Sequence, residues 1–273
     1  MLIAGSERLG RMAAVRQPEK AEALASNLRQ VCPGLDEHGL RALVEDGFAS
    51  YGRYWAETLR LPTLDAEAID SGFEVEGYEH LLATRDAGFG PIMVLPHLGG
   101  WEWAAAWLGR VAQTPVTAVV ERLQPPDVFE WFADLRASYG ISVVPVGPGA
   151  LPALTRAVRD RHVVCLLGDR DIAGTGVAVD FFGSAASLPI GPAILSRRTG
   201  APIHPTAVYF DGAKRRCVVG EPIWPSGHGR LRDEARATTV QVAAALEDLI
   251  RAAPDQWHVL EPLWDGELHA GPG

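Results

Sequence analysis

A histidine and a glutamate stand five residues apart in the stretch VLPHLGGWEWAAAW, where an apolar run ends in a polar turn. On a continuous helix, residues at this spacing lie roughly 140° apart and do not meet. They meet only if His97 lies in a strand-to-helix turn and Glu102 in the first helical turn. A histidine that is oriented by a carboxylate can take a proton from a hydroxyl. The spacing therefore predicts a general base.

Two glycines separate these residues. Gly99 and Gly100 allow a tight turn and a close approach of backbones. Their amides, with the positive end of the following helix, are predicted to face an oxyanion. The chain has no Gly-x-Ser-x-Gly elbow, so direct transfer to an acceptor hydroxyl is favoured over a covalent acyl-enzyme.

The elements that must position these groups follow from the hydrophobic pattern. Helical spacing dominates the first 90 residues. After them, short runs rich in Val and Ile predict buried strands; they span residues 91–96, 115–121, 141–146, 162–168 and 202–210. Helical patterns alternate with these runs, which predicts an α/β fold with a mixed, mostly parallel central sheet flanked by helices. We expect one domain over residues 1–273, with a mainly helical part at 1–90 and a catalytic core at 91–273.

Ionisable side chains follow three of these predicted strands. In open α/β sheets, ligands bind at the carboxyl ends of the strands. The sequence therefore predicts that the groups converge at one edge of the sheet; they are His97, then Glu121 and Arg122, and then Asp169, Arg170 and Asp171.

Composition narrows the function classes. Hydrophobic residues make up 47% of the chain and charged residues 22%, as in folded globular proteins. A formal net charge of -9 disfavours a general nucleic-acid surface. The three cysteines match no zinc spacing, and we expect neither a metal nor a spanning helix. The first 20 residues fit a surface helix or an amphipathic helix at a membrane surface, and the sequence leaves both open.

Four segments, in order, resemble one known family. HLGGWE resembles the H-x4-D/E box of glycerolipid acyltransferases, in the branch of the lipid A late acyltransferases, which usually carry Asn where this chain has Gly100. The next segments are VVERLQPPDVFEWFADLRASYGISVVP, LLGDRDIAGTGVAVDFFGSAASLPIGPAILSRRTGAPIHP and DQWHVLEPLW. The series resembles the actinobacterial phosphatidylinositol mannoside acyltransferases most closely, over roughly residues 45 to 265.

The resemblance implies roles for single residues. His97 is implied as the base that activates a sugar hydroxyl, with an acyl-CoA thioester as donor. Asp169 takes the place of the acid that bonds this histidine, although the phosphatidylinositol mannoside enzymes have Glu there. Glu102 fills the acidic position of the box. Further polar positions of the groove are matched by Glu121 and Arg136, and candidate phosphate partners are Arg122, Arg136 and Arg170.

The implied protein is a membrane-associated O-acyltransferase without cofactor, peripheral on the cytoplasmic face, with acyl-CoA and a lipid or glycolipid acceptor as substrates. Trp101, Trp103 and Trp107 are candidates to line an apolar slot for the acyl chain, or else ordinary core residues. Three alternatives stay open at this point: another glycolipid or secondary-metabolite acceptor, an acyl-CoA thioesterase, and a non-catalytic lipid-binding protein.

Overall fold

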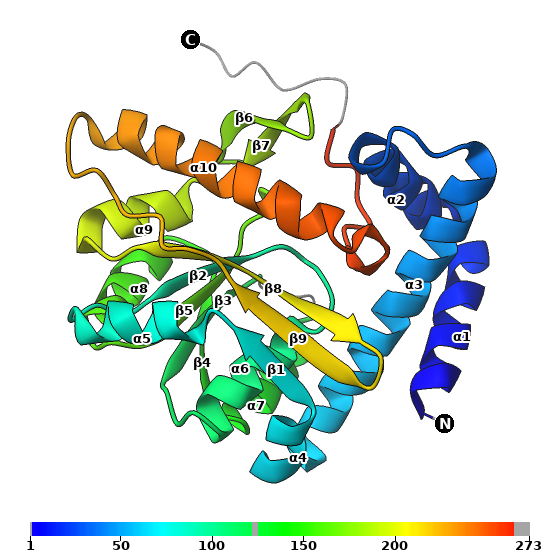
Figure 1. Ribbon diagram of the computed structural model, residues 1–273, viewed down its shortest axis with the longest axis horizontal. Helices are drawn as coiled ribbons and strands as arrows, with labels where there is room; N and C mark the ends of the chain where they lie inside the picture. Colours follow the sequence, from blue (N-terminus) through cyan, green and yellow to red (C-terminus); the bar gives the residue numbers. More distant parts are fainter. Residues whose placement is uncertain (1, 122–124, 265–273) are drawn as a thin grey trace.

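A computed structural model describes residues 2–121 and 125–264 of the chain (Figure 1). It confirms the mixed α/β fold predicted from the sequence. Neighbouring strands of the seven-stranded sheet are parallel, except for one antiparallel pair, β8 with β9. The strand order is β1 (Phe73–Glu76), β9 (Lys214–Val219), β8 (Ile203–Asp211), β2 (Ile92–Leu95), β5 (Val163–Leu167), β3 (Val116–Val120) and β4 (Ile141–Pro145).

Each face of the sheet is covered by its own apolar core. Along β2, the four residues are buried and point alternately to the two faces. Ile92 and Val94 join a core with α8 (Ala150–Arg159), α9 (Gly191–Thr199) and α10 (Leu231–Arg251). Met93 and Leu95 join the core formed with α4 (Ala66–Ser71), α5 (Tyr78–Asp86) and α6 (Trp101–Arg110). This double burial explains why the strands read as continuous apolar runs.

Three helices gather at one side of the molecule, α1 (Leu2–Arg16), α2 (Pro18–Val31) and α3 (Glu37–Arg60) (Figure 1). The carboxylate of Asp36 accepts the Gly39 N–H at 2.7 Å and caps α3. Leu24 on α2 and Phe48 on α3 pack into the same core as α8, α9 and α10. Within the described residues, none of the helices is both long and apolar enough to cross a membrane.

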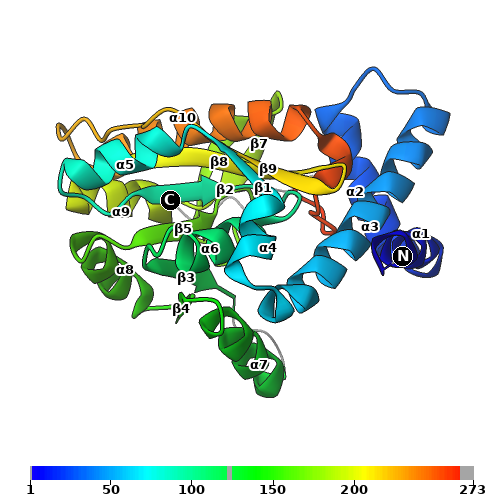
Figure 2. The same cartoon turned by 60° about the horizontal axis from the view of Figure 1, so that its bottom comes forward.

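β4 is the edge strand at one side of the sheet, and α7 (Pro126–Ala137) lies beyond it (Figure 2). The five predicted strands are present, but four others were not predicted. β1 lies inside the segment expected to be helical, and β9 begins with three basic residues. β6 (Val177–Phe181) and β7 (Ser184–Leu188) form a separate hairpin. α10 ends at Arg251, before the short 3-10 helix η2 (Pro254–Gln256).

Candidate active site

The candidate base and its carboxylate follow two neighbouring strands. β2 and β5 are parallel partners, so their carboxyl ends meet at one edge of the sheet. His97 follows β2 and Asp169 follows β5. The imidazole Nδ1 lies 2.6 Å from Asp169 Oδ1, and the His97 backbone N–H donates to Oδ2 at 2.8 Å. The structure thus brings these two residues together as a dyad.

The environment of Asp169 keeps it ionised. Its side chain is fully buried, and burial alone would raise its pKa. The His97 ring, the indole N–H of Trp257 and the His97 backbone N–H outweigh this and hold the pKa of Asp169 below its usual value. An ionised carboxylate accepts the Nδ1–H, so the Nε2 of the imidazole carries the lone pair.

Glu102 does not orient His97. Its carboxylate, buried at the start of α6, forms an ion pair with Arg136 and accepts the Tyr139 hydroxyl at 3.0 Å. Burial alone would lower the pKa of Arg136, but the charge of Glu102 raises it above its usual value. The structure therefore brings Glu102 and Arg136 together, separately from the dyad.

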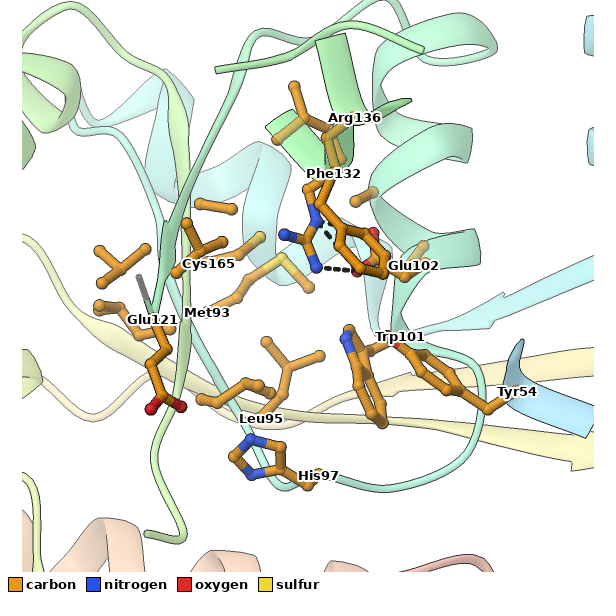
Figure 3. A pocket seen from close by; sticks show the side chains of 18 of the residues that line it. Tyr54, Met93, Leu95, His97, Trp101, Glu102, Glu121, Phe132, Arg136 and Cys165 are labelled. Atoms are coloured by element: carbon orange, nitrogen blue, oxygen red, sulfur yellow. Dashed lines mark hydrogen bonds and ion pairs between the residues drawn. The ribbon is translucent and has the colours of Figure 1, made fainter. Parts of the chain in front are cut away.

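An apolar cavity of about 250 Å³ lies between the dyad and this ion pair. Figure 3 shows His97 at one end and Glu102 with Arg136 at the other, with Met93 and Leu95 between them. Much of the wall is aliphatic or aromatic. Further lining residues are Trp101, Ala105, Leu108, Ala118, Phe132 and Cys165.

A second hollow of about 200 Å³ lies on another side of His97. Its wall is more polar and includes Lys20, Tyr51 and Arg170. Four residues line both spaces: His97, Tyr54, Trp55 and Trp101. His97 therefore stands where an apolar and a polar space meet.

The prediction that the Gly99 and Gly100 amides face an oxyanion is wrong. The Gly99 N–H donates to the Gln256 carbonyl and the Gly100 N–H to the Val208 carbonyl, both at 2.9 Å. A backbone donor that is already bonded to a carbonyl is not free to bind an oxyanion. The two glycines instead dock the turn against β8 and η2.

The close contact of this turn with β8 explains why both positions are occupied by glycine. Gly99 has a φ of +61°, and a Cβ there would collide with the Val208 carbonyl oxygen. A Cβ on Gly100 would lie 3.0 Å from the Phe210 ring. The asparagine that the resemblance implies at this position would require Phe210 to move.

Only one of the three tryptophans proposed for the acyl slot lines it. Trp101 faces the cavity. Trp103 donates to the Ile69 carbonyl at 3.1 Å, and Trp107 donates to Asp70 at 2.8 Å. These two indoles anchor α6 to α4, because helical spacing turns them away from the cavity.

The remaining predicted residues lie around the same space. Glu121 lines the cavity, and its carboxylate lies 3.6 Å from Arg170. Arg170 also pairs with Glu261 at 3.2 Å. Arg122 lies outside the described residues, and its predicted contact with phosphate stays a prediction.

Sequence reasoning missed other residues of the site. Trp257 touches Asp169, and His258 lines the polar hollow beside His97. Both belong to DQWHVLEPLW, a segment of the resemblance. Burial, then His97, lowers the pKa of His258 to about 3, so its ring is neutral.

Comparisons with known proteins identify relatives of this chain by sequence. A phosphatidylinositol mannoside acyltransferase of Mycobacterium tuberculosis is 38% identical over 224 residues, covering 80% of this chain and 69% of the relative. A protein of the same name from Mycolicibacterium smegmatis is 35% identical over 233 residues, covering 83% and 73%.

Among solved structures, the crystal structure of the 1-acyl-sn-glycerophosphate acyltransferase PlsC from Thermotoga maritima matches with a TM-score of 0.40 and 16% identity. It covers 86% of this chain and 96% of that one. The sequence of the chain matches the family model of the bacterial lipid A biosynthesis acyltransferases over residues 2–265. The chain belongs to this family and is an acyltransferase.

Proposed function

We propose that this enzyme transfers a fatty acyl group from acyl-CoA to a hydroxyl of a phosphatidylinositol mannoside. The His97 Nε2 takes the proton of the hydroxyl, whose oxygen attacks the thioester carbon. The carbon–sulfur bond then breaks, and the proton passes to the CoA sulfur, which leaves as a thiol. This reaction uses no cofactor or metal. The observation that carries the proposal is the His97–Asp169 dyad, placed where an apolar and a polar space meet.

The two spaces suit the two substrates. The apolar cavity offers an acyl chain a surface on which each buried methylene contributes about 0.8 kcal/mol. The polar hollow offers hydrogen bonds from Tyr51 and Arg170 to a glycosylated phosphate headgroup. Arg170 is already paired with Glu121 and Glu261. Lys20 therefore supplies the positive charge. We therefore assign the acyl chain to the first space and the acceptor headgroup to the second.

Direct transfer is supported by the thiol in the cavity wall. Burial raises the pKa of Cys165 to about 12, so the thiol stays protonated at neutral pH and is a poor nucleophile. With the two glycine amides already bonded, we assign stabilisation of the oxyanion to the positive end of α6, which begins at Trp101 beside the cavity.

We further propose that the protein binds peripherally to the cytoplasmic face of the membrane. The outer side of α1 exposes Leu9 and Val15, whose side chains are 65% and 82% exposed, with Met12 between them. Arg8 and Arg16 are exposed on the same helix, and basic residues beside an apolar row are typical of interfacial helices. Flotation with vesicles of phosphatidylcholine and anionic phosphatidylglycerol tests this. Loss of binding in Leu9→Asp/Val15→Asp is expected, and absence of binding by the wild type would contradict the proposal.

The test of the reaction uses radiolabelled palmitoyl-CoA and phosphatidylinositol mannoside acceptors. The wild type is expected to form acylated lipid, and His97→Ala is expected to form none. His228→Ala replaces an exposed histidine outside the site and is the matched control. Equal turnover by His97→Ala and wild type would disprove the role of His97.

A second acceptor class is supported by Gly100, since the family usually carries an amide side chain at this place in the site. Acyl transfer to another glycolipid or a secondary metabolite, and not to phosphatidylinositol mannosides, would favour it. Release of free fatty acid that no added acceptor accelerates would instead indicate a thioesterase.

A further inference from the structure

One short segment after α10 holds both members of the dyad. The Trp257 indole N–H donates to Asp169 Oδ2 at 2.8 Å. The backbone N–H of the next residue, His258, donates to the His97 carbonyl at 2.7 Å. Trp257 is fully buried, so water does not compete for the Asp169 carboxylate at this point. Consecutive residues of one turn thus contact the base and the acid.

The segment is itself fixed to the sheet. Gln256 Oε1 accepts the Phe210 N–H at 2.7 Å, and Gln256 Nε2 donates to the Phe210 carbonyl at 3.1 Å. The Gln256 carbonyl accepts the Gly99 N–H from the turn after His97. The residue before Trp257 is therefore hydrogen-bonded both to β8 and to the turn that follows His97, which fixes the position of the indole.

The three donors around Asp169 contact different oxygens of its carboxylate. Oδ2 accepts both the His97 backbone N–H and the Trp257 indole N–H, and Oδ1 faces the imidazole Nδ1. Two donors on one oxygen fix the plane of the carboxylate, which aims the other oxygen at the ring. An indole N–H only donates and does not titrate, so it stabilises the anion without supplying a proton.

We propose that Trp257 is a positioning residue of the acyl transfer. Its indole N–H orients the Asp169 carboxylate and stabilises its negative charge, so that the His97 ring presents Nε2 to the acceptor hydroxyl. The proposal rests on the proposed function in one respect, that His97 is the base.

A neighbouring indole separates this role from packing. Trp257 and Trp264 lie in the same aromatic cluster, with ring centroids 6.4 Å apart. The Nε1 of Trp264 is buried as well, but it has no hydrogen-bond partner among the described residues. Replacing either indole by a phenyl ring removes aromatic volume and one N–H. Only at Trp257 does it remove a donor to the dyad.

The experiment compares the pH dependence of kcat/KM in Trp257→Phe, Trp264→Phe and wild type. In Trp257→Phe we expect kcat to fall by about 10- to 100-fold. We also expect the acid limb of the profile to move to higher pH, because the pKa of Asp169 rises and the coupled pair holds its proton more tightly. In Trp264→Phe we expect the acid limb of the kcat/KM profile to stay at the same pH as in the wild type. The other charged or titratable groups that line the two spaces around His97 are unchanged in both variants: His258, Lys20, Arg170, Arg136, Glu121, Glu102, Glu261, Tyr51, Tyr54 and Cys165.

Two results would overturn the proposal. If the rate of Trp257→Phe falls equally at every pH, Trp257 contributes only to packing and does not position the Asp169 carboxylate. An equal shift of the limb in both variants would show that the aromatic cluster, not the N–H, matters.

A second measurement needs no variant at Trp257 to fold. In wild type labelled with ¹⁵N-tryptophan, the Trp257 indole proton is expected downfield, because it donates to the ionised Asp169 carboxylate. An indole proton at the chemical shift of an unbonded N–H would contradict the proposal, even if no acyl acceptor is ever found. Absence of transfer in wild type would count only against the proposed function.

Discussion

The two ends of the cavity use carboxylates in opposite ways. At one end, three donor groups bond the Asp169 carboxylate, and the imidazole it orients lines both the apolar cavity and the polar hollow. At the other end, Glu102 is engaged by Arg136 and Tyr139. Burial and the charge of Glu102 raise the pKa of Tyr139 well above its usual range, so this network does not exchange protons near neutral pH. The comparison teaches that histidine and glutamate of one sequence box serve separate tasks, and we infer proton transfer for the first and cavity wall for the second.

The largest effect is expected at the dyad end. Asp169→Asn removes the negative charge that orients the imidazole, and kcat/KM should fall by about 10²- to 10⁴-fold. Steady-state kinetics with palmitoyl-CoA checks this, with thermal unfolding to show that the variant is folded. A variant that keeps a tenth or more of the activity would remove Asp169 from the mechanism.

At the opposite end, we expect a loss of stability. Glu102→Gln leaves the Arg136 charge buried without a counter-charge, which should lower the free energy of unfolding by about 3–5 kcal/mol. Below its melting transition the variant should lose less than about tenfold in kcat, a far smaller loss than Asp169→Asn.

The double variant Glu102→Leu/Arg136→Met is the control for this pair. Because no unpaired charge remains, it should recover most of the lost stability in urea unfolding. If Glu102→Gln were as inactive as Asp169→Asn while folded, the division of tasks between the two ends would be wrong.

The dyad end should also be the acid-sensitive one. His258 has a pKa of about 3 in the folded protein, against about 6.5 when unfolded. Between these values only the unfolded chain binds the proton, so stability should fall by about 1.4 kcal/mol for each pH unit below 6.5. The lowered pKa of Asp169 acts in the other window, and its contribution is lost only below its usual value of 3.8. Urea unfolding between pH 6.5 and 4.5 should show a shallower slope in His258→Gln, and an unchanged slope would contradict the assignment.

The smallest effect concerns the space between the two ends. Ala105→Phe places a ring in the cavity, and the preference for palmitoyl over decanoyl-CoA should fall by about tenfold, since each excluded methylene forfeits about 0.8 kcal/mol. Ala137→Phe makes the same change on the exposed end of α7 and should keep the preference. Equal chain selectivity in both variants would place the acyl chain elsewhere.

Much of the dyad end was predictable from the sequence. Apolar runs buried on both faces marked β2, β3 and β5, and parallel strands deliver their final residues to one edge. His97, Glu121 and Asp169 were therefore expected together. The carboxylate partner of His97 lies 72 residues away in sequence, and strand order, which the pattern of residues does not reveal, makes it a neighbour.

The failures have a common physical cause. The amides of Gly99 and Gly100 were expected to be free, because their partners lie on β8 and η2, far along the chain. β9 was missed because its basic residues do not look like a buried strand. Arg215, on β9, is nevertheless buried, since it pairs with Glu57 and stacks over the Trp103 ring at 3.8 Å. Such tertiary partners override local pattern.

The position of Trp257 in the chain also has a consequence for biosynthesis. Base and acid are translated early, at residues 97 and 169, but the donors that fix them arrive with Gln256 and the two residues after it. A nascent chain that has folded its sheet as far as β5 therefore holds an unfinished catalytic centre. The dyad gains these contacts only after the segment beyond α10 has left the ribosome, so the pair is synthesised first and the donors that support it are added later.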